Sequence, residues 1–152
     1  MKFGYVVVFL LGLVLGFGVS FLGSGSISGF VVADVGAPSD WVADEDIVVF
    51  EDRVVLMIEN ATLSSYSGSG SMKPFFDEGA NGIRVVPFNS EEINVGDIVS
   101  FRVGGRLVVH RVVEKGVDSE GVYFVVQGDR NLINDGKVRF EEIEFVTVGV
   151  VF

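Results

Sequence analysis

The stretch "DIVSFRVGGRLVVHRVVE", residues 97–114, decides the fold class of this 152-residue chain. Two runs rich in β-branched and aromatic residues flank Gly104-Gly105, and a glycine pair between such runs is typical of a two-residue hairpin turn. The strands then pair across the turn, Val103 with Arg106, Phe101 with Val108, and Val99 with His110. The stretch therefore predicts a β-hairpin with a defined register.

The hairpin puts the chain's one histidine on an apolar face. Side chains alternate along a strand, so His110 shares its face with neighbours on both strands. These neighbours are Val99, Phe101, Val103, Val108 and Val112. A lone histidine in such a place is either a buried imidazole bonded to a carbonyl oxygen or a functional group, and the hairpin alone leaves both readings open.

The chain beyond residue 46 is predicted to be mainly β. Its segments are a hairpin over 47–59 that turns at Glu51-Asp52, a loop over 59–70, a strand over 82–88 that Pro87 places at an edge, and strands over 121–127 and 145–152. None of these segments shows a helical apolar period. The spacing of the strands favours a small barrel or sandwich.

The amino-terminal region is predicted to be a membrane anchor. Phe3 to Leu22 carries no charge, and about 20 apolar residues suffice for a helix to cross a bilayer. Lys2 precedes this segment and several acidic residues follow it, so the domain should lie outside the cytoplasm. A cleaved signal peptide is the alternative, but its apolar core is usually only about 7–15 residues long. We expect an anchor at 3–22, a linker at 23–46 and a β-rich domain at 47–152.

Composition excludes several classes of function. The formal net charge is −10, whereas a nucleic-acid site needs a basic surface. The chain has no cysteine and one histidine, so neither a thiolate nor a histidine-rich metal site can form, and we expect no metal or cofactor.

Two polar loops contain the remaining parts of a hydrolytic site. "SGSGSMKPFF" (67–76) presents Ser71 after a glycine, and "QGDRNLIND" (127–135) carries Asp129 and Asp135. A serine hydroxyl is a weak nucleophile until a histidine held by a carboxylate takes its proton. The alternatives for the second loop are ordinary Asx turns or a partial calcium loop, which lacks the terminal glutamate.

These motifs resemble those of type I signal peptidases, in the archaeal and endoplasmic-reticulum branch that uses Ser-His-Asp. The matching blocks, in family order, are "SGSMKP" (69–74), "GDIVSF" (96–101), "HRVV" (110–113), "GDRN" (128–131) with Asp135, and "VGVV" (148–151). The resemblance covers residues 67–152. It implies a β-rich catalytic domain beside a membrane.

The resemblance also implies a role for each site residue. Ser71 corresponds to the nucleophile, His110 to the general base, Asp135 to the acid of the triad and Asp129 to a second aspartate that supports the site. Ser69 corresponds to an oxyanion-binding position, and Met72 lies next to the nucleophile as a further substrate-binding candidate. Phe75-Phe76, the long segment 77–92 and Arg130 depart from the family pattern. Of these, Phe75-Phe76 is expected to narrow the substrate groove and alter substrate choice.

The predicted function is that of a membrane-anchored serine endopeptidase that removes signal peptides from exported preproteins. Its expected partners are those signal peptides, membrane lipid and the secretion machinery, with no nucleic acid. Two alternatives stay open: a related membrane protease with a narrow set of surface proteins as substrates, and a non-catalytic β domain that binds membrane proteins.

Overall fold

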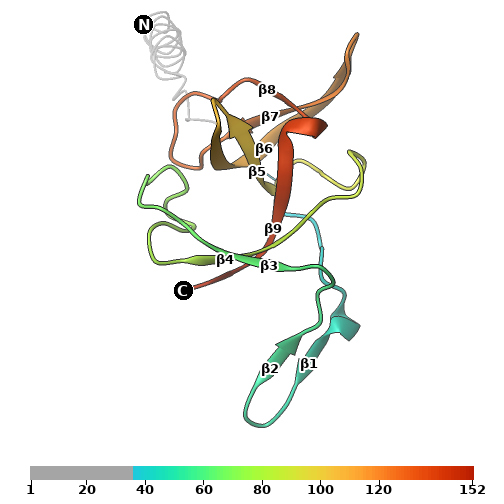
Figure 1. Ribbon diagram of the computed structural model, residues 1–152, viewed down its shortest axis with the longest axis vertical. Helices are drawn as coiled ribbons and strands as arrows, with labels where there is room; N and C mark the ends of the chain where they lie inside the picture. Colours follow the sequence, from blue (N-terminus) through green and yellow to red (C-terminus); the bar gives the residue numbers. More distant parts are fainter. Residues whose placement is uncertain (1–35) are drawn as a thin grey trace, which may run out of the picture. The chain divides into compact units, whose positions relative to one another are not determined.

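A computed structural model describes residues 36–152 (Figure 1). Within them the chain forms strands and two short 3-10 turns, Asp44–Asp46 and Phe140–Glu142. The strands are β1 (Ile47–Val49), β2 (Val54–Leu56), β3 (Thr62–Ser65), β4 (Asn81–Val85), β5 (Ile98–Val103), β6 (Arg106–Asp118), β7 (Gly121–Gln127), β8 (Lys137–Arg139) and β9 (Ile143–Val151). The prediction of a mainly β chain is confirmed.

Seven of the strands form one antiparallel sheet. Their order is β3-β4-β9-β5-β6-β7-β8, while β1 and β2 pair only with each other. Figure 1 shows β3 and β4 at one end of this sheet and β5 to β8 at the other, with β9 running between the two groups. The carboxyl-terminal half of β9 pairs with β4 and its amino-terminal half with β5. The last strand of the chain thus joins the two parts that flank the candidate site.

The β5–β6 hairpin has the predicted register. Val99 pairs with His110, Phe101 with Val108 and Val103 with Arg106. Both turn glycines have positive φ, 54° and 81°, which a type I′ turn requires and which glycine adopts without strain. The sequence therefore placed the histidine on the correct face.

Two apolar clusters fill the space between the strands. The larger contains Phe101, Phe124 and Val146, each at most 1% exposed, and part-buried Trp41 packs against it. The smaller contains Met72, Phe76, Ala80 and Ile98. Met72 of this smaller cluster directly follows Ser71, the candidate nucleophile. Packing of the cluster therefore holds the turn that carries Ser71 in place.

Three details of the predicted strands are wrong. Residues 62–65 form β3 instead of a loop, because this polar segment gains backbone hydrogen bonds by pairing with β4 while its side chains stay largely exposed. β4 is an inner strand, between β3 and β9, and it ends at Val85, before Pro87 could interrupt the pairing. The short strand β8 was not predicted.

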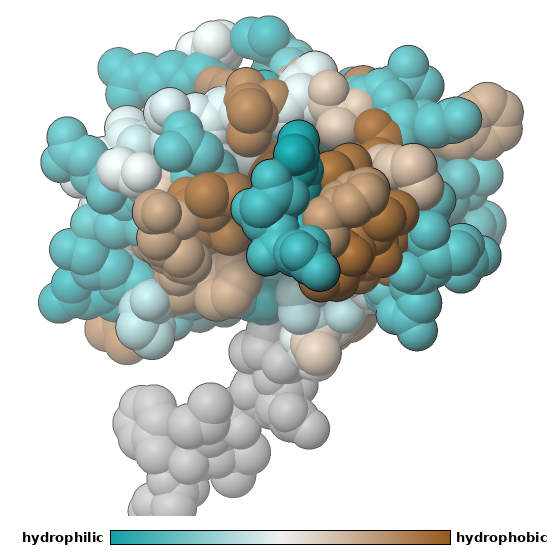
Figure 2. All heavy atoms as spheres, turned by 90° about the horizontal axis from the view of Figure 1, so that it is seen from below, coloured by the Kyte–Doolittle hydropathy of each residue, from teal (hydrophilic) through white to brown (hydrophobic). Residues whose placement is uncertain are grey.

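The β1–β2 hairpin forms as predicted and leaves apolar side chains exposed. Val49 is 72% exposed, Val54 60%, and Phe50 and Met57 52% each. Figure 2 looks at the molecule from the side of this hairpin and shows hydrophobic residues gathered around a small hydrophilic group. A two-stranded ribbon is at best marginally stable in water by itself. Apolar residues gathered on an exposed surface commonly mark a site of contact with a protein or a membrane.

The predicted anchor at 3–22 and most of the linker lie outside the described residues. Among residues 36–152, no helix has the length and apolar character that crossing a membrane requires.

Candidate active site

His110 and Asp135 form the central pair of the candidate site. The imidazole Nδ1 lies 2.5 Å from Asp135 Oδ2, and the histidine residue is only 5% exposed. The Asp135 side chain is one-third exposed, at 33%. A carboxylate on Nδ1 orients the ring and leaves Nε2 available for another partner.

The loop after β7 carries Asp135 back to His110. Asp135 N–H donates to Val126 O at 2.9 Å, and Asn131 N–H donates to Gly128 O at 2.8 Å. The Gln127 side chain closes the loop by donating to Asn131 O at 2.6 Å. These bonds fold residues 128–135 onto the end of β7, which lies beside β6, the strand of His110.

Asp129 is bound to Arg111, the residue after the histidine. Oδ1 accepts from Arg111 Nε and Oδ2 from Nη2, each at 2.8 Å, so the pair is bidentate. The two side chains are 11% and 16% exposed. Arg111 Nη1 also donates to Gly96 O at 2.9 Å. The ion pair therefore fastens the loop to β6 without using the carboxylate that contacts His110.

The turn that carries Ser71 is held by Asp77. Gly70 has φ 73°, and its N–H donates to Asp77 Oδ1 at 3.0 Å. The other carboxylate oxygen of Asp77 lies 2.7 Å from Lys73 Nζ. The hydrogen bond from Lys73, followed by that from the Gly70 amide, lowers the pKa of Asp77 below its ordinary value of 3.8. Asp77 thus stabilises the turn in its charged form.

Ser69 and Ser71 lie side by side on this turn. Their hydroxyl oxygens are 3.1 Å apart, and the Ser71 N–H donates to Ser69 Oγ at 3.4 Å. Within residues 36–152, no hydrogen bond joins the Ser71 hydroxyl to His110. Catalytic hydrogen bonds are often long in the absence of substrate and shorten when it binds. The substrate-free geometry is therefore compatible with transfer of the Ser71 proton to His110.

Gly128 is the point where the nucleophile turn and the histidine meet. A Cβ at this position would lie 2.8 Å from Ser71 O and 2.9 Å from His110 Nε2. The turn is further tied to the loop because Arg130 N–H donates to Ser71 O at 2.9 Å. Nε2, the nitrogen that Asp135 leaves available, is therefore adjacent to the backbone of Ser71.

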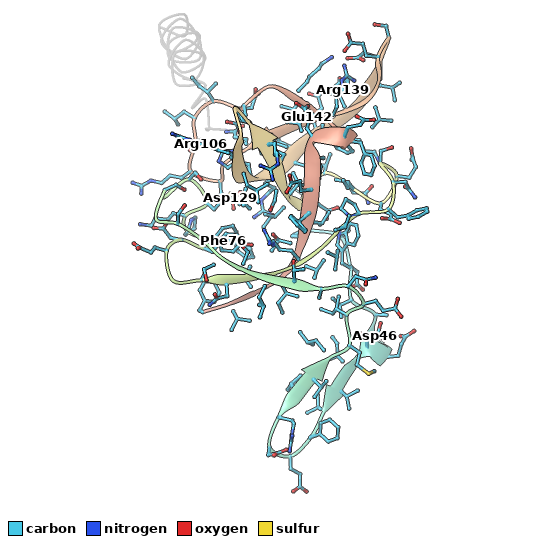
Figure 3. The ribbon with its side chains drawn as sticks, viewed as in Figure 1. Asp46, Phe76, Arg106, Asp129, Arg139 and Glu142 are labelled. Atoms are coloured by element: carbon cyan, nitrogen blue, oxygen red, sulfur yellow. The ribbon has the colours of Figure 1, made fainter. Side chains whose placement is uncertain are left out.

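A pocket of about 330 Å³ opens beside these residues. Ser69, Ser71, His110 and Asn131 supply polar atoms to its wall. Its apolar wall is formed by Tyr66, Met72, Phe76, Leu107 and Val109, and the Tyr66 and Phe76 rings stack at 4.2 Å. Phe76, Arg106 and Asp129 lie toward the same side of the domain in Figure 3.

One strand edge beside the pocket carries no partner strand. Residues 106–111 of β6 pair with β5 on one side, and pairing with β7 on the other side begins only at Arg111, opposite Gln127. Residues 106–110 line the pocket. Their second edge, unpaired among the described strands, can accept an extended peptide as an added strand.

The structure brings all predicted site residues to one region, and it adds others. The pocket is lined by Ser69, Ser71, Met72 and His110. Asp135 contacts His110, and Asp129 accepts hydrogen bonds from Arg111 of β6. Asp77, Asn131 and Tyr66 were missed. No local signal marks Asp77, because its carboxylate accepts from the Gly70 amide seven residues earlier in the chain.

The calcium alternative requires several oxygen donors that converge on one point. Within residues 36–152, no three acidic or histidine side chains cluster in a way that could hold a metal ion. Asp129 faces an arginine and Asp135 a histidine, so these two carboxylates serve different partners. A serine, a histidine–aspartate pair and a pocket in one region are the parts that a serine hydrolase site requires.

Comparison with known proteins finds a partial match to a peptidase subunit. The chain is 36% identical over 69 residues to the signal peptidase complex catalytic subunit SEC11 of Scheffersomyces stipitis, a match that covers 44% of this chain and 40% of that protein. This match confirms the resemblance to the archaeal and endoplasmic-reticulum branch of type I signal peptidases that the motifs indicate. No family model and no solved structure matches the chain. The match covers less than half of that protein's length, so sequence similarity alone does not assign its activity to this chain.

Proposed function

We propose that the protein is a membrane-anchored serine endopeptidase that removes signal peptides from exported preproteins. The observation that carries this proposal is the His110–Asp135 pair in the wall of the pocket, whose Nε2 has no hydrogen-bond partner among the described residues and lies next to the Ser71 turn. The similarity to a signal peptidase catalytic subunit supports the choice of substrate class.

The chemistry follows from the roles of three residues. His110 Nε2 takes the proton of the Ser71 hydroxyl as the oxygen attacks the scissile carbonyl carbon, and Asp135 stabilises the imidazolium that forms. The negative oxygen of the tetrahedral intermediate accepts hydrogen bonds from the Ser71 amide and the Ser69 hydroxyl. A single such donor contributes about 3 kcal/mol to transition-state stabilisation. The amine leaves with the proton from His110, and water then hydrolyses the acyl-serine.

The substrate binds as an extended strand along residues 106–110 of β6. Its backbone bonds to the open strand edge, and its alternate side chains enter the pocket walled by Met72, Phe76 and Val109. The family resemblance implies small side chains at the first and third positions before the cut.

Cleavage of a preprotein with an Ala-x-Ala site by membranes that contain the full chain tests this proposal. Wild-type protein should release the signal peptide, and Ser71→Ala and His110→Ala should each remove nearly all cleavage. Ser64→Ala, in exposed strand β3, is the matched control and should cleave like wild type. A folded, membrane-bound wild-type protein that binds preproteins without cutting them would instead favour a non-catalytic binding domain, and cutting of only a few surface proteins would favour the narrower protease.

Membrane attachment is part of the same proposal. Phe3–Leu22 has the length and apolar character of a span, and the apolar β1–β2 hairpin gives the domain a second surface suited to lipid. The domain then lies on the outer side of the cell membrane, where it meets preproteins at the secretion machinery. Protease added to intact cells should digest the domain. Protection until lysis, or a mature chain that begins near Gly29, would contradict this arrangement.

The hairpin's share in membrane attachment can be measured separately. In vesicle flotation, Val49→Ser combined with Phe50→Ser should reduce lipid association of protein that lacks residues 3–22. Leu63→Ser, which alters an equally exposed apolar residue on β3, is the control and should change flotation little.

A further inference from the structure

Arg106 is the one arginine among the described residues that line the pocket. It occupies the first position of β6, opposite Val103, and shares a strand face with His110 four residues later. At a rise of about 3.3 Å per residue, the two Cα atoms lie roughly 13 Å apart along the strand. Arg106 therefore lies at the end of the pocket away from the histidine.

The guanidinium of Arg106 has no acidic partner within residues 36–152. It shares this lack of an ion pair with Arg84 and Arg130, but neither of these two lines the pocket. Most cations of this region are paired with carboxylates. These pairs are Arg53–Asp52, Lys73–Asp77, Arg102–Glu144, Arg111–Asp129, Lys115–Glu91, Lys137–Asp118 and Arg139–Asp118. Arg106 forms none of the ion pairs or hydrogen bonds in this part of the chain. Its counter-charge is thus not supplied by the described fold.

The acidic residue in the pocket wall does not cancel this charge. Asp77 is bound to Lys73 at 2.7 Å and to the Gly70 amide at 3.0 Å, so the Asp77–Lys73 pair is neutral as a unit. Among the described residues, the other ionisable side chains in the wall are Tyr66 and His110. With a neutral histidine, the wall therefore carries one net positive charge at the Arg106 end.

We infer that Arg106 selects substrates with an acidic side chain at the fourth or fifth residue before the cut. This inference rests on the proposed function, in which the side chains before the cut enter the pocket whose wall includes Arg106. A peptide along residues 106–110 with its scissile bond at Ser71 and His110 then extends its preceding residues toward Arg106. The roughly 13 Å between Arg106 and His110 corresponds to four residues of that peptide. The carboxylate would form a charge-assisted hydrogen bond with the guanidinium.

The expected preference is modest, because Arg106 is exposed and its charge is hydrated. Exposed ion pairs contribute little, which corresponds to about a two- to fivefold difference in kcat/KM between acidic and neutral peptides. Added salt should weaken the preference, since the Debye length falls to about 3 Å at 1 M ionic strength.

Competitive cleavage of matched peptides by the membrane-embedded full chain tests this inference. Two peptides share an Ala-x-Ala site and differ only in Glu or Gln at the fourth residue before the cut, and a second pair carries the change at the fifth residue. Wild type should favour the Glu peptide in one pair, Arg106→Gln should cleave both at similar rates, and Arg106→Glu should favour Gln over Glu. Arg102→Gln, which removes a paired arginine outside the pocket, should keep the wild-type ratio.

The outcomes separate this inference from the proposed function. Cleavage by wild type with a Glu-to-Gln ratio of one in both pairs, or an unchanged ratio in Arg106→Gln, would overturn the role of Arg106 alone. No cleavage of any peptide would overturn the proposed function and the inference with it.

Discussion

Replacing Asp129 with asparagine should destabilise the domain far more than loss of a turn aspartate, for which about 1 kcal/mol is usual. Both Asp129 oxygens accept from Arg111 at 2.8 Å, and the two side chains are 11% and 16% exposed. Asparagine keeps one acceptor but leaves the guanidinium buried without a counter-charge. Breaking a buried pair in this way costs about 3 kcal/mol. For a domain of this size, the melting temperature should fall by roughly 10 °C.

Asp135→Asn should lower the cleavage rate strongly and the stability of the domain little. Its carboxylate is one-third exposed and makes its single side-chain contact, within the described residues, with His110, so the melting temperature should change little. The imidazole, however, loses the group that fixes its tautomer and stabilises its charged form. In a serine protease triad this loss lowers the rate on the order of 10⁴-fold.

Thermal melts and cleavage rates of the two purified variants in detergent check both statements. The double variant Arg111→Gln with Asp129→Asn controls for the unpaired charge and should melt above Asp129→Asn alone. A stable, inactive Asp129→Asn beside an active Asp135→Asn would refute the reasoning and exchange the two roles.

Two further predictions concern the serine turn. Gly128→Ala should lower the cleavage rate about 100-fold, because its Cβ would lie 2.8 Å from Ser71 O and displace the nucleophile, and small displacements lower the rate by about that factor. Gly149→Ala is the control and should cleave normally, because the atom nearest to its Cβ is a flexible side-chain carbon at 3.3 Å. Equal cleavage rates of the two variants would contradict this account. The depressed pKa of Asp77 means that its ion pair with Lys73 stabilises the fold fully above pH 3.8 and less as pH falls below that value. Asp77→Asn should therefore lose stability at pH 6 relative to wild type, and the difference in melting temperature should shrink toward pH 3; a constant difference would argue against the ion pair.

The hairpin that carries His110 could be predicted from sequence because its information is local. Gly104-Gly105 fixes the turn type, and the turn fixes the register of every residue on both strands. β3 and β8 could not be predicted in this way. They are short and poor in alternating apolar residues, and they become strands only because an existing strand edge offers backbone partners.

The site residues could be nominated from sequence, but their contacts could not. Ser71, His110 and Asp135 come from three segments that only the folded sheet brings together. The two aspartates have different partners, because the Arg111 side chain reaches Asp129 from the neighbouring strand whereas Asp135 contacts His110. The role of Asp77 likewise depends on the turn geometry at Gly70, which the sequence does not specify.

The central claim is that Ser71 becomes acylated during turnover, and trapping that intermediate tests it most directly. Membrane-embedded protein is mixed with excess preprotein, quenched in acid within milliseconds to seconds, digested and analysed by mass spectrometry. The account predicts an adduct, with the mass of the fragment before the cut, on the peptide that holds residues 67–76 and specifically on Ser71; Asp135→Asn should yield far less of it, and Ser71→Ala none. Turnover with an adduct on Ser69 instead, or cleavage that persists in Ser71→Ala, would contradict the account.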